Sequence, residues 1–290
     1  MTKLTHISVP LWQGAEKPGM NLAPETLRQL GLESMLASKY TVNHYRMQPL
    51  NADEHANKYT VLADYLGTLK QEVLRAFEQA SFPLLIGGDH ALGLGSAAAT
   101  IEHFDNAGII WFDAHCDMNT EATSPTGHIH GMPLAALMGL CSSDLNAIPT
   151  RYIKPENIIW IGPRSIDKGE RKLINDKHLY GYTAEEIHQQ GMANAMNDVI
   201  QYIRKQGIKH IHLSIDVDAL DPQFFPATSV PEADGLTLDD FNLFVQGLSH
   251  LRGQIEAMDW VEYNPTLDND NQACGKWCVS AIEQILQTIL

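Results

Sequence analysis

The sequence predicts an α/β protein, specifically a three-layer α/β/α sandwich with a mostly parallel central sheet. Two observations lead to this fold class. Short apolar segments alternate with longer amphipathic segments along the chain, and His and Asp residues gather where three of the apolar segments end. Such alternation is typical of parallel strands with helices on both faces. No internal repeat and no Pro/Ser-rich linker interrupts the pattern, so we expect a single domain over residues 1–290.

The apolar segments are short enough to be strands, and the amphipathic segments carry apolar residues at helical spacing. We expect strands at 6–9, 41–45, 82–86, 108–112, 158–161, 210–215 and 255–259. We expect helices at 24–36, 52–79, 92–103, 131–138, 192–205, 237–250 and 273–289. Pro24 suits the first turn of the first helix, and the last helix is expected to pack on the sheet.

Composition excludes several classes of function. The formal net charge of −15 argues against electrostatic binding to nucleic acid. No apolar run approaches the length of a membrane span, and the N-terminus lacks the apolar core of a signal peptide. The four cysteines form no CxxC pair and no dense disulfide framework, which favours a reduced cytoplasmic location.

The segment that ends in Asp113-Ala114-His115-Cys116-Asp117 is the most informative part of the chain. In an extended backbone alternate side chains share a face, so Asp113, His115 and Asp117 are expected to project together, with Cys116 packing on the other side. Burying two carboxylates and an imidazole without compensation would cost several kcal/mol each, roughly. A divalent metal ion is the expected compensation.

Two other segments repeat this arrangement. One apolar segment ends in Asp216-Val217-Asp218, and another ends in Gly87-Gly88-Asp89-His90. Because open α/β sheets bind ligands at the carboxyl ends of their strands, these side chains are expected to converge. A hydrogen-bonded structural network would be the alternative for any single segment.

The candidate ligands are too many, and too rich in oxygen, for one zinc ion. They are His90, Asp113, His115, Asp117, Asp216 and Asp218. Bridging carboxylates favour two ions about 3.5–4 Å apart. Oxygen-rich ligation with two imidazoles suits Mn²⁺, while Zn, Co, Ni and Fe remain open. Two such ions would lower the pKa of a shared water, which predicts metal-assisted hydrolysis at a planar, electrophilic centre.

The three segments together resemble the signature motifs of the ureohydrolase family, which includes arginases, agmatinases and formiminoglutamases. They are Gly87-Gly88-Asp89-His90, residues 113–119, and Ser214 through Pro222. Val261-Glu262-Tyr263-Asn264-Pro265 is similar to the Glu-x-Asn-Pro segment of that family. The resemblance covers essentially the whole chain, and within the family it is greatest to the arginases.

The resemblance implies an arginase-like fold with two Mn²⁺ ions per subunit and a bridging hydroxide that attacks the guanidinium carbon. Asp113 and Asp216 would bridge the ions, with His90 and Asp117 on the first and His115 and Asp218 on the second. Asp117 would also relay a proton to the departing amine. His130 corresponds to the proton-shuttle histidine of the family, and Glu262 would hold the guanidinium by charge-assisted hydrogen bonds. A structural loop histidine is the alternative for His130.

The same resemblance implies that L-arginine is hydrolysed to L-ornithine and urea. Asn119, Ser124 and Thr126 would contact the substrate carboxylate, and Asp167, with help from Glu170, its ammonium group. Asp167 as the cap of a helix is an open alternative. His128 stands where arginases usually have Asn, and Val230 departs from their Gly-Thr-Pro segment.

Several alternatives therefore remain. The substrate could be another guanidino acid, formiminoglutamate or agmatine, although agmatine lacks the carboxylate. Two readings from other classes are a non-catalytic metal-binding protein and a single-zinc deacetylase. The resemblance also implies a homo-oligomer, trimeric or hexameric.

Overall fold

The computed structural model describes residues 1–51, 57–142 and 144–290. Within these ranges the backbone forms one eight-stranded sheet in the order β2-β1-β3-β8-β7-β4-β5-β6. All neighbouring strands pair in parallel. The strands are β1 (Lys3–Val9), β2 (Thr41–Arg46), β3 (Phe82–Gly87), β4 (Gly108–Phe112), β5 (Ile158–Ile161), β6 (Tyr180–Tyr182), β7 (Ile211–Asp216) and β8 (Ile255–Val261).

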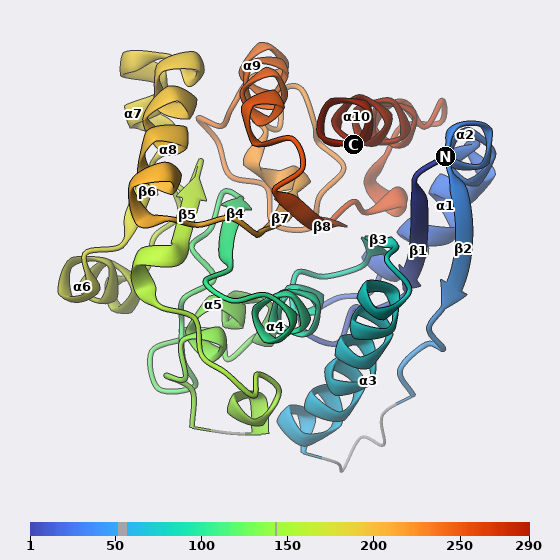
Figure 1. The fold of residues 1–290 in the computed structure, drawn as a ribbon. Coiled ribbons are helices and arrows are strands. Elements are labelled where there is room, and N and C mark those ends of the chain that lie inside the picture. Colours follow the sequence, from blue (N-terminus) through green and yellow to red (C-terminus); the bar gives the residue numbers. More distant parts are fainter. Residues whose placement is uncertain (52–56, 143) are drawn as a thin grey trace.

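Helices cover both faces of this sheet (Figure 1). The helices are α1 (Ala23–Gln29), α2 (Leu32–Lys39), α3 (Lys58–Glu78), α4 (Leu92–His103), α5 (Pro133–Leu137), α6 (Lys168–Lys177), α7 (Ala184–Gln190), α8 (Met192–Gln206), α9 (Leu238–Leu248) and α10 (Ala273–Ile289). One apolar cluster joins the sheet to α1, α2 and α7–α10, and a second joins it to α3, α4 and α5. The three-layer fold class is therefore confirmed.

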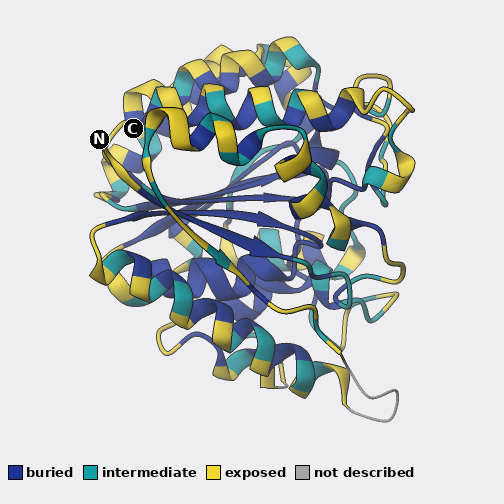
Figure 2. Ribbon diagram, turned by 90° about the vertical axis from the view of Figure 1, so that its right-hand side faces the viewer, coloured by how far each residue is buried: buried dark blue, intermediate teal, exposed yellow. Residues whose placement is uncertain are grey.

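Side-chain burial follows these layers. In the side view the central strands are buried, and most covering helices bury one face and expose the other (Figure 2). Helices α4 and α5 are buried along nearly their whole length. All residues of β3, β4, β5 and β7 are buried. A parallel strand covered on both faces has no solvent side, which explains why these segments read as continuous apolar runs rather than as alternating ones.

The seven strands expected from the sequence are present, with bounds shifted by at most three residues. Strand β6 was not predicted, because it is only three residues long and half-buried. Helix α7 was not predicted either, and α6 was considered only as the alternative in which Asp167 caps a helix. The mean hydropathy of α6 is low, and its single buried residue is Glu170, so it lacks the apolar stripe that marks a helix in the sequence.

The helix predicted over 24–36 is wrong as a single element. The chain ends α1 at Gln29 and begins α2 at Leu32, and Gly31 between them has a φ of +98°. The helix predicted over 52–79 begins at Lys58, with Asn57 accepting the Tyr59 N–H as its cap; residues 52–56 lie outside the described ranges. The expected helix 131–138 is a 3₁₀ turn, Ile129–Gly131, followed by α5.

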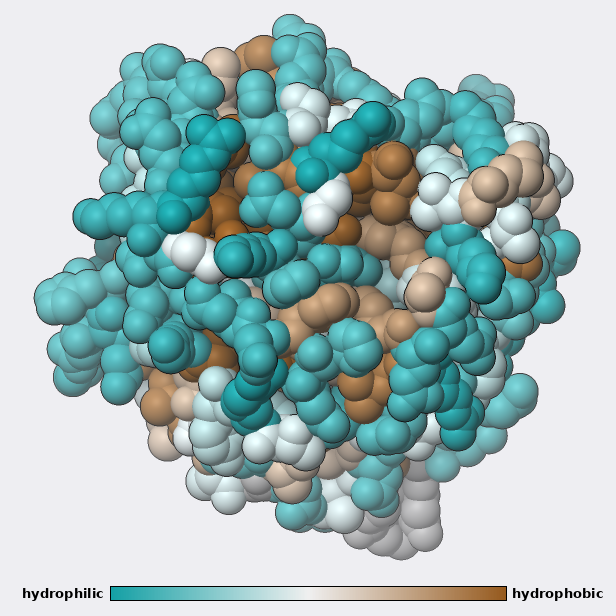
Figure 3. All heavy atoms as spheres, viewed as in Figure 1, coloured by the Kyte–Doolittle hydropathy of each residue, from teal (hydrophilic) through white to brown (hydrophobic). Residues whose placement is uncertain are grey.

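Two surface observations bear on the expected partners. Among the described residues, no helix is long and apolar enough to cross a bilayer. On the face that carries both chain termini, hydrophobic residues are visible mainly in hollows between hydrophilic ones (Figure 3).

Candidate active site

The expected metal ligands follow three strands at the centre of the sheet, β3, β4 and β7, and Glu262 follows a fourth, β8. Strands β3, β8, β7 and β4 are adjacent, and all are parallel, so their carboxyl ends meet at one edge of the sheet. The turn after β3 packs closely against the segment that follows β1. A Cβ on Gly88 would lie 1.6 Å from the carbonyl oxygen of Leu11, so only glycine fits there. The Leu11 carbonyl also accepts the Asp89 N–H at 3.1 Å.

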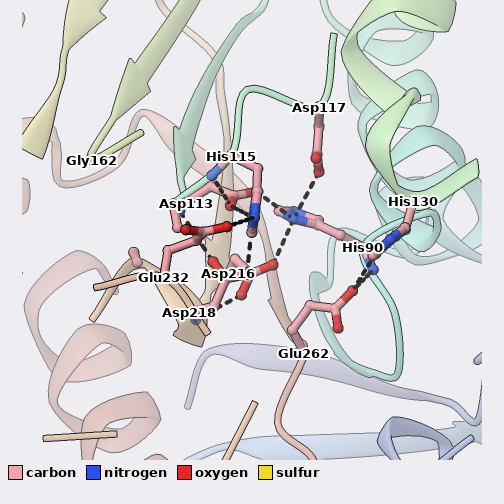
Figure 4. Close-up of polar contacts among 12 residues, drawn as sticks. His90, Asp113, His115, Asp117, His130, Gly162, Asp216, Asp218, Glu232 and Glu262 are labelled. Atoms are coloured by element: carbon pink, nitrogen blue, oxygen red, sulfur yellow. Dashed lines mark hydrogen bonds and ion pairs between the residues drawn. The ribbon is translucent and has the colours of Figure 1, made fainter. Parts of the chain in front are cut away.

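His90 lies at the centre of the first ligand group. Its Nδ1 atom is 2.9 Å from Asp113 Oδ2, 3.2 Å from Asp117 Oδ2 and 3.1 Å from Asp216 Oδ2. All four side chains are buried. Figure 4 shows them converging from the segments that follow β3 and β4 and from the end of β7.

His115 lies at the centre of the second group. Its Nδ1 atom is 3.4 Å from Asp113 Oδ1 and 3.1 Å from Asp218 Oδ2. The two carboxylate oxygens of Asp113 therefore face different imidazoles, one in each group. His115 Nε2 lies 3.7 Å from Glu232 Oε1, a contact that was not predicted. Glu232 belongs to the long loop after β7, and no local motif marks it.

The convergence arises differently from the strand alternation we expected. β4 ends at Phe112, and Asp117 has a left-handed backbone with φ of +51°. Asp216 ends β7, whereas Asp218 belongs to a 3₁₀ turn, Val217–Ala219, which Asp216 caps by accepting the Asp218 N–H. Turns after the strands, rather than the strands themselves, bring Asp117 and Asp218 toward the histidines. Cys116 is buried in the apolar cluster below α5, as expected.

The charge of this cluster fits divalent cations. Burial raises the pKa of Asp117 and Asp216, and the nearby carboxylates Asp113 and Asp218 respectively add to the rise. Burial would also raise the pKa of Asp113, but hydrogen bonds to His115 and His90 hold it below its usual range. Asp117 Oδ2 is buried and makes no hydrogen bond within the described part of the chain. Two groups of His and Asp ligand atoms, which share Asp113, are each compact enough to hold an ion.

Buried residues that were not predicted hold His90 in place. Its ring stacks on Trp111 at 3.9 Å between centroids, and Trp111 Nε1 donates to Asp113 Oδ2. On the other side, Ser214 Oγ lies 2.9 Å from His90 Nε2 and donates to Asp259. Asp259 also pairs with His212 at 2.8 Å. The sequence signal that could have identified them is that Asp259 and His212 are polar residues within otherwise apolar strands. A ligating histidine is commonly oriented in this way through its second nitrogen.

His130 and Glu262 form a pair beside the ligands. His130 Nδ1 lies 3.1 Å from Glu262 Oε1, which also accepts the His90 N–H at 2.9 Å. Glu262 Oε2 is buried and has no hydrogen-bond partner among the described residues. Burial alone would lower the pKa of His130, but the hydrogen bond to Glu262 raises it above its usual value.

A cavity of about 480 Å³ lies over both ligand groups. Thirteen of the fourteen predicted site residues line it: His90, His115, Asp117, Asn119, Ser124, Thr126, His128, His130, Asp167, Glu170, Asp216, Asp218 and Glu262. Asp113 does not, and its side chain is 1% exposed. The structure thus brings the predicted residues together around one space.

The predicted substrate-contacting side chains differ in the hydrogen bonds that they already make within the protein. Asn119 Nδ2 donates to Asp167 at 2.8 Å, which joins two segments that the sequence analysis had linked only through a substrate. Ser124 Oγ accepts the Gly127 N–H and Thr126 Oγ1 accepts the His128 N–H. These are backbone-to-hydroxyl bonds, and the two hydroxyls lie 3.5 Å apart at the rim.

Glu170 and Asp167 hold the local backbone. The Glu170 carboxylate accepts the N–H groups of Met118 and Asp167, so both of its oxygens are engaged. Burial raises the pKa of Glu170 to about 6. Asp167 is the residue before α6, the helix-capping position that had been left open. Glu170 therefore positions Asp167 and the ligand loop through these two backbone contacts.

Comparisons with known proteins match nearly the whole chain to one family. The family model described as the arginase family matches residues 3–287. The arginase of Bacillus subtilis (strain 168) is 37% identical over 289 residues, covering 97% of this chain and 96% of its own. The native structure of arginase from Bacillus caldovelox superposes with a TM-score of 0.92 at 32% identity over 98% of both chains. Entamoeba histolytica arginase in complex with L-ornithine has a TM-score of 0.88 at 32% identity, covering 98% of this chain and 97% of that one.

Proposed function

This chain belongs to the arginase family, and we propose that it hydrolyses the guanidinium group of L-arginine to L-ornithine and urea with two Mn²⁺ ions. One observation carries the proposal: two compact His/Asp groups share Asp113 beneath a single cavity. His90, Asp117 and Asp216 surround one position, and His115 and Asp218 the other. When bound, two divalent ions supply Lewis acidity that makes hydroxide available near neutral pH.

Glu262 is suited to hold the guanidinium group. Its Oε1 atom is engaged by His90 and His130, whereas its buried Oε2 atom has no partner among the described residues. A guanidinium N–H that donates to this oxygen would satisfy it with a charge-assisted hydrogen bond. The acceptor therefore orients the planar carbon of the substrate above the ligand groups.

His130 is suited to move protons between the reaction and solvent. It lies beside Glu262 on one side and lines the cavity on the other. The hydrogen bond to Glu262 raises the pKa of His130, which favours the protonated ring, and the departing amine must acquire a proton. Asp117, whose Oδ2 atom is unbonded in the described chain, would pass a proton over the shorter distance inside the cavity.

The rim of the cavity would hold the amino-acid end of the substrate. Ser124 and Thr126 accept backbone N–H groups, and the hydroxyls, which are 3.5 Å apart, could donate to a carboxylate. Asp167 would face the α-ammonium group while Asn119 braces it. The relative from Entamoeba histolytica was solved in complex with L-ornithine, which retains both groups, and this supports an amino acid as the class of ligand.

A second substrate class has one observation in its favour. His128 lines the cavity next to the Ser124–Thr126 turn, where the family resemblance leads us to expect Asn. An imidazole is larger and can donate only one N–H when neutral. A guanidino acid of different length, such as guanidinobutyrate, is therefore the runner-up.

Product release by the Mn²⁺-loaded protein tests the proposal. Urea is measured with L-arginine, agmatine, guanidinobutyrate and guanidinopropionate, and formamide with formiminoglutamate. A clear preference for L-arginine supports it. Preference for another compound keeps the chemistry and reassigns the substrate. No product with any divalent metal overturns the enzyme assignment. His128→Asn is the informative variant, and unchanged arginine kinetics would show that His128 does not shape the substrate pocket.

A further inference from the structure

A third cluster of potential ligands lies away from the cavity, at the edge of the sheet where β1, β2 and α2 lie together (Figure 1). His6 on β1 and His44 on β2 are direct partners in the parallel register. Glu33, in the first turn of α2, reaches over both. The His6 and His44 Nδ1 atoms are 3.2 Å apart, and Glu33 Oε1 lies 3.8 Å from His6 Nδ1 and 3.7 Å from His44 Nδ1.

The spacing of these three atoms matches metal ligation. Ligand atoms around one tetrahedral zinc, each about 2.0–2.2 Å from the ion, lie roughly 3.3–3.6 Å apart. The measured distances fall around that range. A hydrogen bond between His6 and His44 would explain the distance between the two imidazoles. It would not require a Glu33 oxygen to lie at nearly the same distance from both. The three residues qualify as a compact ligand group in the same sense as the two groups beneath the cavity.

The state of His6 also suits a ligand. Its side chain is only 1% exposed, and its Nδ1 atom faces both His44 and Glu33. Burial, and then the nearby His44, lower the pKa of His6 to about 4. At neutral pH the ring is therefore uncharged, which is the form that coordinates a metal.

We propose that His6, His44 and Glu33 bind one divalent transition-metal ion of the zinc class, separate from the two positions beneath the cavity. Two imidazole nitrogens and one carboxylate oxygen form a ligand set that zinc accepts. His44 and Glu33 are partly exposed, so water can fill the fourth position. The ion would tie α2 to an edge strand that pairs only with β1 within the described sheet.

Arg46 competes with the ion for Glu33. Its Nη2 atom donates to Glu33 Oε1 at 2.7 Å, the same oxygen that faces the histidines. The Arg46 side chain is 58% exposed, and a flexible surface guanidinium gains little from such an ion pair. Binding would displace it into solvent. Replacing Arg46 with Gln is therefore expected to tighten metal binding several-fold.

The number of metal ions bound per subunit tests the site. Replacement of Mn²⁺ by Zn²⁺ beneath the cavity changes the identity of the bound ions but not their total number. The Mn²⁺-loaded protein receives one equivalent of Zn²⁺, passes through gel filtration and is analysed for all metals. The wild type is expected to hold one ion more per subunit than His44→Gln and Glu33→Gln. Even loss of a residue that only orients a ligand weakens binding 10–100-fold, so we expect at least about a 100-fold rise in Kd.

His210→Gln is the matched control. His210 is a half-exposed histidine that pairs with Glu256 at 2.8 Å and has no second histidine in a ligand group. The proposal stands if this variant keeps the additional ion and both site variants lose it while remaining folded by circular dichroism. Equal metal content in all four proteins overturns it, as does equal loss in the His210 variant. The difference of one ion is independent of urea production, so failure of the proposed reaction would not affect this result.

Discussion

The centre of the sheet and its β2 edge each hold a His/carboxylate cluster, and the two clusters have similar dimensions but different construction. Beneath the cavity, the ligands follow the carboxyl ends of central strands, and two nearby residues, Asp117 and Glu262, have left-handed backbones with φ of +51° and +64°. At the edge, His6, His44 and Glu33 belong to regular strands and a helix. A left-handed backbone costs a non-glycine residue of order 1–3 kcal/mol.

This difference separates a strained site from an unstrained one. The turns beneath the cavity place carboxylates where regular structure would not, and the surrounding core stabilises them. The edge cluster needs no such support, because strand register alone aligns His6 with His44. Substitutions beneath the cavity should therefore change chemistry and folding together, whereas substitutions at the edge should change metal content and local stability.

The largest expected effect is at Asp216. Replacing it with Asn removes a carboxylate that faces His90, and metal ions that stabilise developing charge contribute several kcal/mol to catalysis. We expect at least about a 10³-fold loss in kcat/KM together with loss of bound Mn²⁺, measured by urea release and metal analysis. Asp105→Asn, at a 97% exposed carboxylate, should behave as wild type. Full activity in the Asp216 variant would exclude the cavity as the catalytic centre.

His130 should have the next largest effect. His130→Asn removes the proton carrier and is expected to lower kcat by about 10²–10⁴-fold while changing KM little. Added imidazole should restore part of the rate. A purely structural histidine would instead leave kcat near the wild-type value or show no rescue by imidazole.

After metals are removed by a chelator, the edge cluster should make the free energy of unfolding depend on pH in the acid range. The pKa of His6 is about 4 in the folded protein and about 6.5 when unfolded. The unfolded state therefore binds the extra proton first, and stability is lost as pH falls from about 6.5 to 4. The loss should reach about 2–3 kcal/mol. Urea unfolding at pH 7 and pH 5 should show a smaller change for His6→Asn; an identical change would show that His6 is not neutral when folded.

The smallest effect concerns substrate recognition at the rim. Thr126→Val removes one hydroxyl donor and is expected to raise KM for L-arginine about 5–30-fold, the equivalent of about 1–2 kcal/mol. Agmatine lacks the carboxylate, so any agmatine turnover should be unaffected. Thr150→Val, at an exposed threonine outside the cavity lining, is the control. Equal losses on both substrates would remove Thr126 from carboxylate recognition.

Local patterns predicted the sheet and the cavity ligands because both depend on short segments. Apolar runs marked the central strands, and Asp113, His115 and Asp117 stand within five residues of each other. The predicted alternation was wrong in detail, because Asp117 lies in a left-handed turn. Gly31 could not be recognised as a break without its φ value.

The residues that were missed depend on contacts between distant segments. His6 and His44 meet only because β1 and β2 pair in one register. Asp259 and Ser214 support His90 only because β8 and β7 are neighbours in the sheet. Glu232 reaches His115 from a loop whose path has no local signature. Each of these required the order of the strands, which a single sequence does not contain.

The close approach at Gly88 has an evolutionary consequence. A side chain at that position would collide with the backbone of Leu11, and no substitution at position 11 can remove a carbonyl oxygen. The glycine is therefore required by main-chain geometry, whatever compound the cavity accepts. Substitutions at the rim of the cavity, at residues such as His128, can change the selectivity for substrates. Position 88, by contrast, accepts no amino acid other than glycine.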